Sequence, residues 1–343
     1  MAAAIQKRLL RTVLSLPTPV LRAASGGKVV YAGGRTLDPR FQFLMHAARR
    51  RSPSADVIDA EAEAADFAIL RGEAEPGVVC TPVTIDGPRG TIAAQLYRPK
   101  DQDASAPMLV YAHVEAARTP GDPAEAFCGM LAKAGRTAVL SLHHRLEHGA
   151  GLDAGLEDML TALRWAQENG ADQGAAPWLV AVGGDGLGAN LVAAACQMLR
   201  SLGDRQPELQ LLLYPALDMA SETASMATYA EAAVLAPELA AWREGRLIGA
   251  QDSPHDPRVS PLRAPDVSGL APAVIAAAGF DPLLDQGEAY ARRLRDAGVA
   301  VRYRCHDHLP HGFAAFTGVS PAAEAACREV AALVAESLHG ASP

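Results

Sequence analysis

Three absences narrow the classes of protein to which this chain of 343 residues can belong. It has no long run of Lys and Arg and a formal net charge of −8, so nucleic acid is not an expected partner. It has no apolar run of the roughly 18 residues that a membrane-spanning helix needs. Its five cysteines are widely spaced and form no Cys-x-x-Cys pair, which predicts reduced thiols in a cytoplasmic protein.

What the chain does have is an alternation of strand-like and helix-like runs from about residue 78 onward, with 49% hydrophobic residues overall. The short apolar runs are typical of buried parallel strands. Their alternation with helices predicts an α/β fold, with a mostly parallel central sheet flanked by helices on both faces. The expected strands are 83–85, 92–97, 108–112, 137–142, 178–182, 209–214, 273–278 and 299–304, and the expected helices are 124–134, 156–168, 190–201, 286–297 and 322–338.

Two segments fall outside this alternation, residues 1–75 and residues 219–252, and both have helical patterns. We expect neither to supply strands to the sheet. Together they are interpreted as a split helical lid over the carboxyl ends of the strands, where α/β sheets bind their ligands. The core then consists of residues 76–218 and residues 253–343.

The first of these segments begins with apolar residues at near-helical spacing, interleaved with basic ones. The apolar residues are Ile5, Leu9, Leu10, Val13, Leu14 and Leu16, and the basic residues are Lys7, Arg8 and Arg11. Such a helix is typical of an amphipathic anchor, of a targeting segment or of a lid helix over an apolar pocket. A signal peptide is disfavoured because Arg11, Ser15 and Pro17 interrupt the apolar stretch. We favour the lid helix and leave open a weak peripheral contact with a membrane.

The most informative stretch is Gly184-Asp185-Gly186-Leu187-Gly188, which follows an apolar run and opens a helical pattern. A strand, a tight turn and a helix in this order are the setting of the Gly-x-Ser-x-Gly nucleophile elbow. The outer glycines have the right spacing, but Gly186 stands where the nucleophilic serine would be. A dinucleotide-binding turn is the other interpretation of these glycines, and it is weaker because Asp204 precedes the next strand instead of ending it.

Several further blocks, in the right order along the chain, resemble the hormone-sensitive-lipase branch of the α/β-hydrolases. Residues 256–262 resemble that family's Asp-Pro-x-x-Ser-Pro-Leu block, residues 213–218 its turn after the elbow helix, residues 279–285 its acid motif and residues 311–313 its histidine motif. The resemblance covers most of the chain. It implies an α/β-hydrolase fold in which Asp281 is the catalytic acid and His311 the catalytic histidine.

The chain departs from this family at residues that carry the chemistry. Besides Gly186, the family's His-Gly-Gly-Gly oxyanion loop is replaced by His113-Val114-Glu115-Ala116-Ala117. The missing glycines are those that let backbone N–H groups approach a developing oxyanion. Val114 is stiff and Glu115 brings a negative charge, so the N–H of Leu187 is left as one donor. Asp185, beside the turn, is expected to make a structural hydrogen bond or to serve the site.

Three functions stay open. The first is a non-hydrolytic acid–base enzyme, such as a lyase, dehydratase, isomerase or cyclase, that acts on an apolar small molecule through His311 and Asp281, with Glu115 as a further proton donor. The second is a ligand-binding pseudoenzyme that keeps the pair as a structural hydrogen bond. The third is a carboxylesterase or lipase-type hydrolase in an inactivated Ser→Gly form. We favour the first because both members of the acid–histidine pair persist.

Other reactive side chains give weaker signals. His306 and His308 have the spacing of metal ligands on a strand, but no cysteine or carboxylate completes a recognisable set, so we predict no metal and no cofactor. Cys196 lies inside the predicted elbow helix and is expected in the core. The expected ligand is an apolar small molecule. A homodimer through an edge strand or the last helix stays open.

Overall fold

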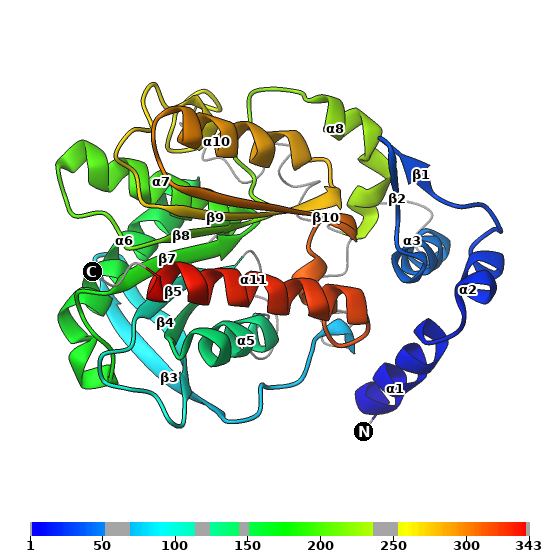
Figure 1. Cartoon of the computed structure of the whole chain (residues 1–343), viewed down its shortest axis with the longest axis horizontal. Helices are drawn as coiled ribbons and strands as arrows, with labels where there is room; N and C mark the ends of the chain where they lie inside the picture. Colours follow the sequence, from blue (N-terminus) through cyan, green and yellow to red (C-terminus); the bar gives the residue numbers. More distant parts are fainter. Residues whose placement is uncertain (1, 52–68, 114–123, 144–150, 236–252, 341–343) are drawn as a thin grey trace.

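The computed structural model describes residues 2–51, 69–113, 124–143, 151–235 and 253–340, and it confirms the predicted α/β fold (Figure 1). The strands of the central sheet are β3 (Val78–Gly87), β4 (Gly90–Pro99), β5 (Met108–Ala112), β6 (Ala138–His143), β7 (Val180–Asp185), β8 (Gln210–Leu213), β9 (Ala273–Phe280) and β10 (Val301–Pro310). Their order across the sheet is β10-β9-β8-β7-β5-β6-β4-β3. β4 pairs antiparallel with β3 and with β6, and the pairs from β6 through β10 are parallel.

Helices cover both faces of this sheet. One face carries α5 (Glu125–Gly135) and α11 (Pro321–His339), and the other carries α6 (Gly151–Asn169), α7 (Leu187–Leu202) and α10 (Leu284–Asp296). Along β5, Leu109 and Tyr111 belong to the core under α5 and α11, whereas Met108 and Val110 belong to the core under α6 and α7. Successive side chains of a strand point to opposite faces, so a strand that is apolar throughout is buried on both. Among the described helices, none is long and apolar enough to cross a membrane.

Several elements run further than the sequence predicts. The first two strands extend to a hairpin in which Gly87 pairs with Gly90, so that Pro88 and Arg89 form the turn at the predicted place. α7 begins at Leu187 instead of residue 190. β10 continues past residue 304 to Pro310, with a register shift between His306 and Pro310. This extension carries the chain to the site described below.

The N-terminal segment is not helical throughout, contrary to our expectation. It contains α1 (Ala2–Leu14), α2 (Thr18–Ala24) and α3 (Pro39–Arg51), and a small separate antiparallel sheet of β1 (Tyr31–Ala32) and β2 (Arg35–Thr36). The reason is the Gly33-Gly34 pair between these strands. Its φ angles of +56° and +80° suit a tight hairpin turn, where two glycines are favoured. The described part of this segment adds no strand to the central sheet, in agreement with the sequence prediction.

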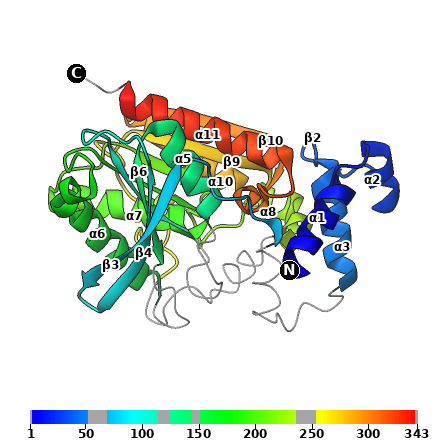
Figure 2. The same ribbon diagram turned by 90° about the horizontal axis from the view of Figure 1, so that it is seen from below.

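The second segment outside the alternation includes α8 (Ala224–Thr228) and the 3-10 helix η2 (Ala230–Leu235), and residues 236–252 lie outside the described ranges. The two segments contact each other, because Arg49 of α3 donates to the backbone and carboxylate oxygens of Glu231. Tyr229 packs on Phe280 at the end of β9, with ring centroids 5.2 Å apart. Figure 2 shows α1, α2 and α3 beside α8 at one end of the molecule. That these segments cover a ligand as a lid stays a prediction.

A partly buried ion pair joins the turn after β8 to the 3-10 helix η3 (Pro261–Arg263). Asp218 Oδ1 accepts hydrogen bonds from Arg263 Nε at 2.8 Å and from the backbone N–H of Ala220 at 2.9 Å. Burial alone would raise the pKa of Asp218. The hydrogen bonds from Arg263, Ser221 and Ala220 outweigh this and hold the pKa below its ordinary value.

Asp218→Asn is therefore expected to lower the free energy of unfolding by about 2 kcal/mol at pH 7, because Arg263 loses its charged partner. A carboxyl whose pKa is lowered by folding stabilises the fold above its unfolded pKa of about 3.9, and this contribution is lost as the pH falls through the folded pKa. Urea unfolding should thus show a smaller difference between the two proteins at pH 3 than at pH 7. Asp266→Asn removes an exposed partner of Arg200 and should change little at either pH. An equal loss for Asp218→Asn at both pH values would contradict this account.

Candidate active site

The chain turns sharply between β7 and α7. β7 ends at Asp185, α7 begins at Leu187, and Gly186 between them has φ +51° and ψ −114°. Most side chains strain a backbone of this kind, whereas glycine adopts it freely. The N–H of Gly186 donates to the carbonyl oxygen of Leu213 at 3.0 Å, and the N–H of Ala216 donates to that of Gly186 at 3.1 Å. Hydrogen bonds on both sides therefore attach this turn to the end of β8.

Close packing requires the two outer glycines of the turn. A Cβ atom on Gly188 would lie 2.0 Å from the carbonyl oxygen of Ala112, and one on Gly184 would lie 2.4 Å from the carbonyl carbon of Gly188. Such distances are far inside van der Waals contact, so only glycine lets the first turn of α7 pass this close to the end of β5. The Gly-x-Gly-x-Gly spacing thus has a steric cause at its outer positions and a conformational one at Gly186.

β9 and β10 bring together the two residues that the resemblance pairs, Asp281 and His311. Phe280 and Pro310 are partners in the parallel ladder, so the residues that follow them leave the sheet side by side. Nδ1 of His311 lies 2.8 Å from Oδ2 of Asp281, and both residues are 1% exposed. The N–H of Leu283 donates to the other carboxylate oxygen at 2.8 Å. An ionised Asp281 keeps a proton on Nδ1, which leaves Nε2 as the nitrogen that can exchange a proton with a ligand.

Tyr214 is not among the residues that the sequence predicts for the site, and it connects the Gly186 turn with the Asp281–His311 pair. Its hydroxyl donates to Oδ2 of Asp185 at 3.1 Å, and its ring lies 4.8 Å from the imidazole of His311. Its φ of +35° is rare for a residue other than glycine, so the surrounding contacts must offset a backbone cost. The only signal in the sequence is a Tyr-Pro pair directly after a buried strand, and no spacing rule relates that pair to residues 185 and 311.

The predicted oxyanion loop is described only at its first residue. His113 follows β5 and is buried, with its ring 5.9 Å from that of His143 in an edge-to-face arrangement. Its backbone nitrogen would lie 3.1 Å from a Cβ on Gly188, which places the start of the loop against α7. Val114 and Glu115 lie outside the described residues, so their roles stay predictions.

The other two residues predicted for the site lie on either side of Gly186. Asp185 accepts the hydrogen bond from Tyr214, which fits the structural interpretation of this carboxylate. Leu187 is the first residue of α7 and is buried. Its N–H belongs to the first turn of the helix, where N–H groups have no acceptor within the helix and carry a partial positive charge. The turn therefore offers a hydrogen-bond donor next to the position of the absent side chain.

His306, His308 and the cysteine of the elbow helix do not extend the site. Nδ1 of His308 lies 2.8 Å from the carbonyl oxygen of Thr36, whereas His306 packs on Phe313, and burial lowers the pKa of His306. In the part of the chain that the structure describes, no three His, Cys, Asp or Glu side chains gather as a metal would need. Cys196 is in the core as expected, and burial raises the pKa of its thiol to about 12, which makes it a poor nucleophile at neutral pH.

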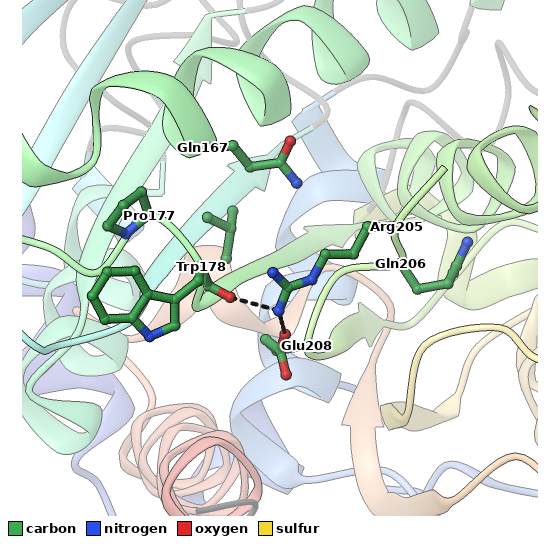
Figure 3. Close-up of a pocket in the computed structure, with 7 residues that line it drawn as sticks. Gln167, Pro177, Trp178, Arg205, Gln206 and Glu208 are labelled. Carbon is green, nitrogen blue, oxygen red and sulfur yellow. Dashed lines mark hydrogen bonds and ion pairs between the residues drawn. The ribbon is translucent and has the colours of Figure 1, made fainter. Parts of the chain in front are cut away.

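A surface pocket of about 340 Å³ lies at the other end of β7 (Figure 3). It is lined by Gln167, Pro177, Trp178, Val180, Arg205, Gln206 and Glu208. Arg205 donates to the carbonyl oxygen of Trp178 and to the carboxylate of Glu208, the two contacts dashed in Figure 3. Val180 is the first residue of β7 and Gly186 follows its last, so roughly 20 Å of strand separates the two places. This pocket is therefore distinct from the candidate active site.

Comparisons with known proteins identify the fold family of the chain. Residues 109–315 match the model of a protein family described by its alpha/beta hydrolase fold. The carboxylic ester hydrolase LipN of Mycobacterium tuberculosis is 40% identical over 312 residues, which cover 87% of this chain and 82% of the relative. The carboxylesterase NlhH of the same organism is 34% identical over 248 residues, which cover 71% of this chain and 77% of the relative.

Solved structures show the same architecture. An alpha/beta hydrolase enzyme from the metagenome of Lake Arreo, Spain, crystallised as a serine-to-alanine mutant, has a TM-score of 0.79 and 31% sequence identity, over 87% of this chain and 96% of that one. A thermostable esterase from Pseudomonas putida has a TM-score of 0.80 at 24% identity, over 88% of this chain and 98% of that one. The second likeness shows the fold alone.

Proposed function

This chain belongs to the α/β-hydrolase fold family of the hormone-sensitive-lipase type, and on that basis we propose that its site is that of a carboxylic ester hydrolase in which Gly186 stands in place of the attacking serine. Relatives named as a carboxylic ester hydrolase and a carboxylesterase support this substrate class. The observation that carries the proposal is the Gly186 turn. This turn leads sharply from a strand into a helix, with φ +51° at Gly186, as a nucleophile elbow does. The start of an ordinary helix does not require such a backbone conformation.

The neighbouring residues support the same chemistry. In such a hydrolase the serine oxygen attacks the ester carbonyl carbon while Nε2 of His311 accepts its proton, which then leaves with the alcohol. Water, activated by the same nitrogen, hydrolyses the acyl-enzyme. The N–H of Leu187 would donate to the developing oxyanion. Gly186 has no oxygen for the first step, so we infer that the present chain binds esters without forming an acyl-enzyme.

The decisive test is to supply the missing hydroxyl. Gly186→Ser is expected to hydrolyse p-nitrophenyl butyrate, and the parent chain is expected to remain close to the rate in buffer. If the Gly186→Ser protein folds but stays inactive, the proposal of an ester-hydrolase site is wrong. Substantial hydrolysis by the parent chain that depends on His311 would show instead that the nucleophile is not needed.

One observation favours a second candidate, the non-hydrolytic acid–base enzyme. The Asp281–His311 pair is buried and hydrogen-bonded at 2.8 Å without any nucleophile at residue 186, and such a pair can move a proton on its own. Glu115 belongs to this candidate as a second proton donor. The family relatives, whose names are those of ester hydrolases, make it the weaker of the two.

Proton transfer and simple binding can be separated by deuterium exchange. Apolar carbonyl compounds incubated with the protein in D2O should lose the proton NMR signal next to the carbonyl if His311 abstracts that proton. His311→Ala should abolish the exchange. A pseudoenzyme that only binds would show no exchange in either protein, while shifts of the ligand signals would persist in His311→Ala.

A further inference from the structure

α1, α2 and the turn between them carry exposed apolar side chains that the candidate active site does not use. Ile5, Leu9, Leu16 and Val20 are all exposed, Leu9 by 61% of its surface, and we call these four residues the N-terminal apolar face. Ile5 and Leu9 share one side of α1, because residues four apart on a helix lie one above the other. Figure 1 and Figure 2 both place α1 and α2 at the periphery of the molecule, away from the central sheet.

The other sides of these helices hold them on the protein. Leu14 at the end of α1 and Leu21 in α2 are each 1% exposed. Arg11 Nε donates a hydrogen bond to the carbonyl oxygen of Gly318, and its guanidinium pairs with the carboxylate of Glu73. The two helices are thus docked through one side, and the N-terminal apolar face is turned to solvent.

The N-terminal segment itself is basic, although Arg11 pairs with Glu73 and Arg35 with Asp307. Residues 1–37 contain six Lys and Arg and no Asp or Glu, in a protein whose formal net charge is −8. Arg8 precedes Leu9 on α1 and is exposed, and Lys28, beyond α2, is exposed as well. Exposed apolar side chains bordered by basic ones are typical of a helix that lies in the plane of a membrane interface.

We propose that the N-terminal apolar face binds the surface of an anionic lipid bilayer, with α1 lying along that surface. Ile5 and Leu9 would insert at the boundary between headgroups and acyl chains, and the basic side chains would meet the anionic headgroups. Each Lys or Arg near such a surface strengthens binding by about fivefold. A second copy of the chain is a poorer occupant, because two such faces would bring like charges together.

This contact would orient the candidate active site. Gly318, which accepts the hydrogen bond from Arg11, follows the 3-10 helix η4 (Phe313–Phe316) and hence His311. The carboxyl ends of β9 and β10, from which Asp281 and His311 emerge, point toward the end of the molecule that carries α1 (Figure 1). Binding would bring that end close to a phase in which apolar esters dissolve. The binding itself does not depend on the proposed hydrolysis.

Sedimentation of the full chain with lipid vesicles tests the proposal. The chain should sediment with vesicles of phosphatidylcholine and phosphatidylglycerol in equal parts, should not sediment with pure phosphatidylcholine, and should be released by high salt. Leu9→Asn, and separately Arg8→Glu with Lys28→Glu, should each weaken binding by at least about tenfold. Leu202→Asn is the matched control, because Leu202 is 60% exposed and lies at the far end of α7, and it should leave binding unchanged.

Three results would overturn the proposal. The first is the absence of sedimentation with the anionic vesicles, and the second is a loss of binding that is as large for Leu202→Asn as for Leu9→Asn. The third is a dimer in analytical ultracentrifugation that Leu9→Asn abolishes, which would assign the face to a second copy. Because vesicle binding is read without any turnover, failure of the ester-hydrolase proposal would leave this result intact. Thermal unfolding of each variant checks that it is folded, and substitutions at exposed side chains should leave the melting temperature nearly unchanged.

Discussion

Gly186→Ser is expected to raise kcat/KM for p-nitrophenyl butyrate by about 10³–10⁴-fold over the parent chain. In the serine protease subtilisin, loss of the nucleophile lowers kcat by about 10⁶-fold. Loss of one oxyanion donor lowers it by about 10²–10³-fold. We expect the loop after His113 to lack such a donor, since residues 114–117 include no glycine. The rate gained by restoring the serine should therefore be smaller than 10⁶-fold, by the factor that the missing oxyanion donor costs.

Gly186→Ala is the matched control for this experiment, because it adds the Cβ atom and the strain of the turn without a hydroxyl. Both substitutions should lower the free energy of unfolding by about 1–3 kcal/mol, since φ at this position is +51°. Only the serine variant should release p-nitrophenol in a burst followed by a slower steady rate. His311→Ala added to Gly186→Ser should return the rate to that of the parent. Equal activity in the alanine and serine variants would show that the hydroxyl is not the attacking group.

Gly188→Ala is expected to lower the free energy of unfolding by about 3 kcal/mol or more. The new Cβ atom would lie 2.0 Å from the carbonyl oxygen of Ala112, and neither α7 nor β5 can move aside without breaking the packing of the sheet. Urea unfolding measures the effect. The same substitution should also abolish activity in the Gly186→Ser background, because α7 and Leu187 would be displaced from the site.

Gly287→Ala provides the contrast, because it makes the same chemical change in a buried helix. Its Cβ atom would meet Pro215 at 3.6 Å, an ordinary contact, and Gly287 lies within α10. Alanine is the better helix former, so this variant should be more stable than the parent by about 0.5–1 kcal/mol. If Gly188→Ala were as stable as Gly287→Ala, our claim that α7 packs too close to β5 for a side chain at residue 188 would be wrong.

The elements that could be predicted from the sequence are those whose hydrophobicity alone defines them. Residues 108–112 are predicted as a strand with the bounds that β5 has, because every residue is apolar and buried. β10 continues through His306, Asp307 and His308, and the polar side chains of these residues give no hydrophobic pattern that would predict a strand. The strand forms there because β10 pairs with β9. β1 and β2 are too short for any periodicity. The signal for these two strands is the Gly33-Gly34 pair, which is typical of a hairpin turn.

The candidate site could be predicted in part, for a similar reason. Asp281 and His311 each stand in a motif that resembles a family block, and the pairing of Phe280 with Pro310 explains why they meet. Tyr214 could not be predicted, because its contacts with Asp185 and His311 depend on a backbone conformation, φ +35°, that no local pattern encodes. The roles of Val114 and Glu115 rest on the sequence alone.

The β9–α10–β10 unit has a consequence for how such a protein can change over generations. It supplies both Asp281 and His311, whereas the Gly186 turn and the loop after His113 follow β7 and β5. Mutations in one half of the site therefore need not disturb the positions of residues in the other. An acid–histidine pair can in this way persist after the nucleophile has been lost, because the register of two paired strands keeps it in place without selection for catalysis. Its survival in a descendant chain is a weaker sign of selection for catalysis than its geometry suggests.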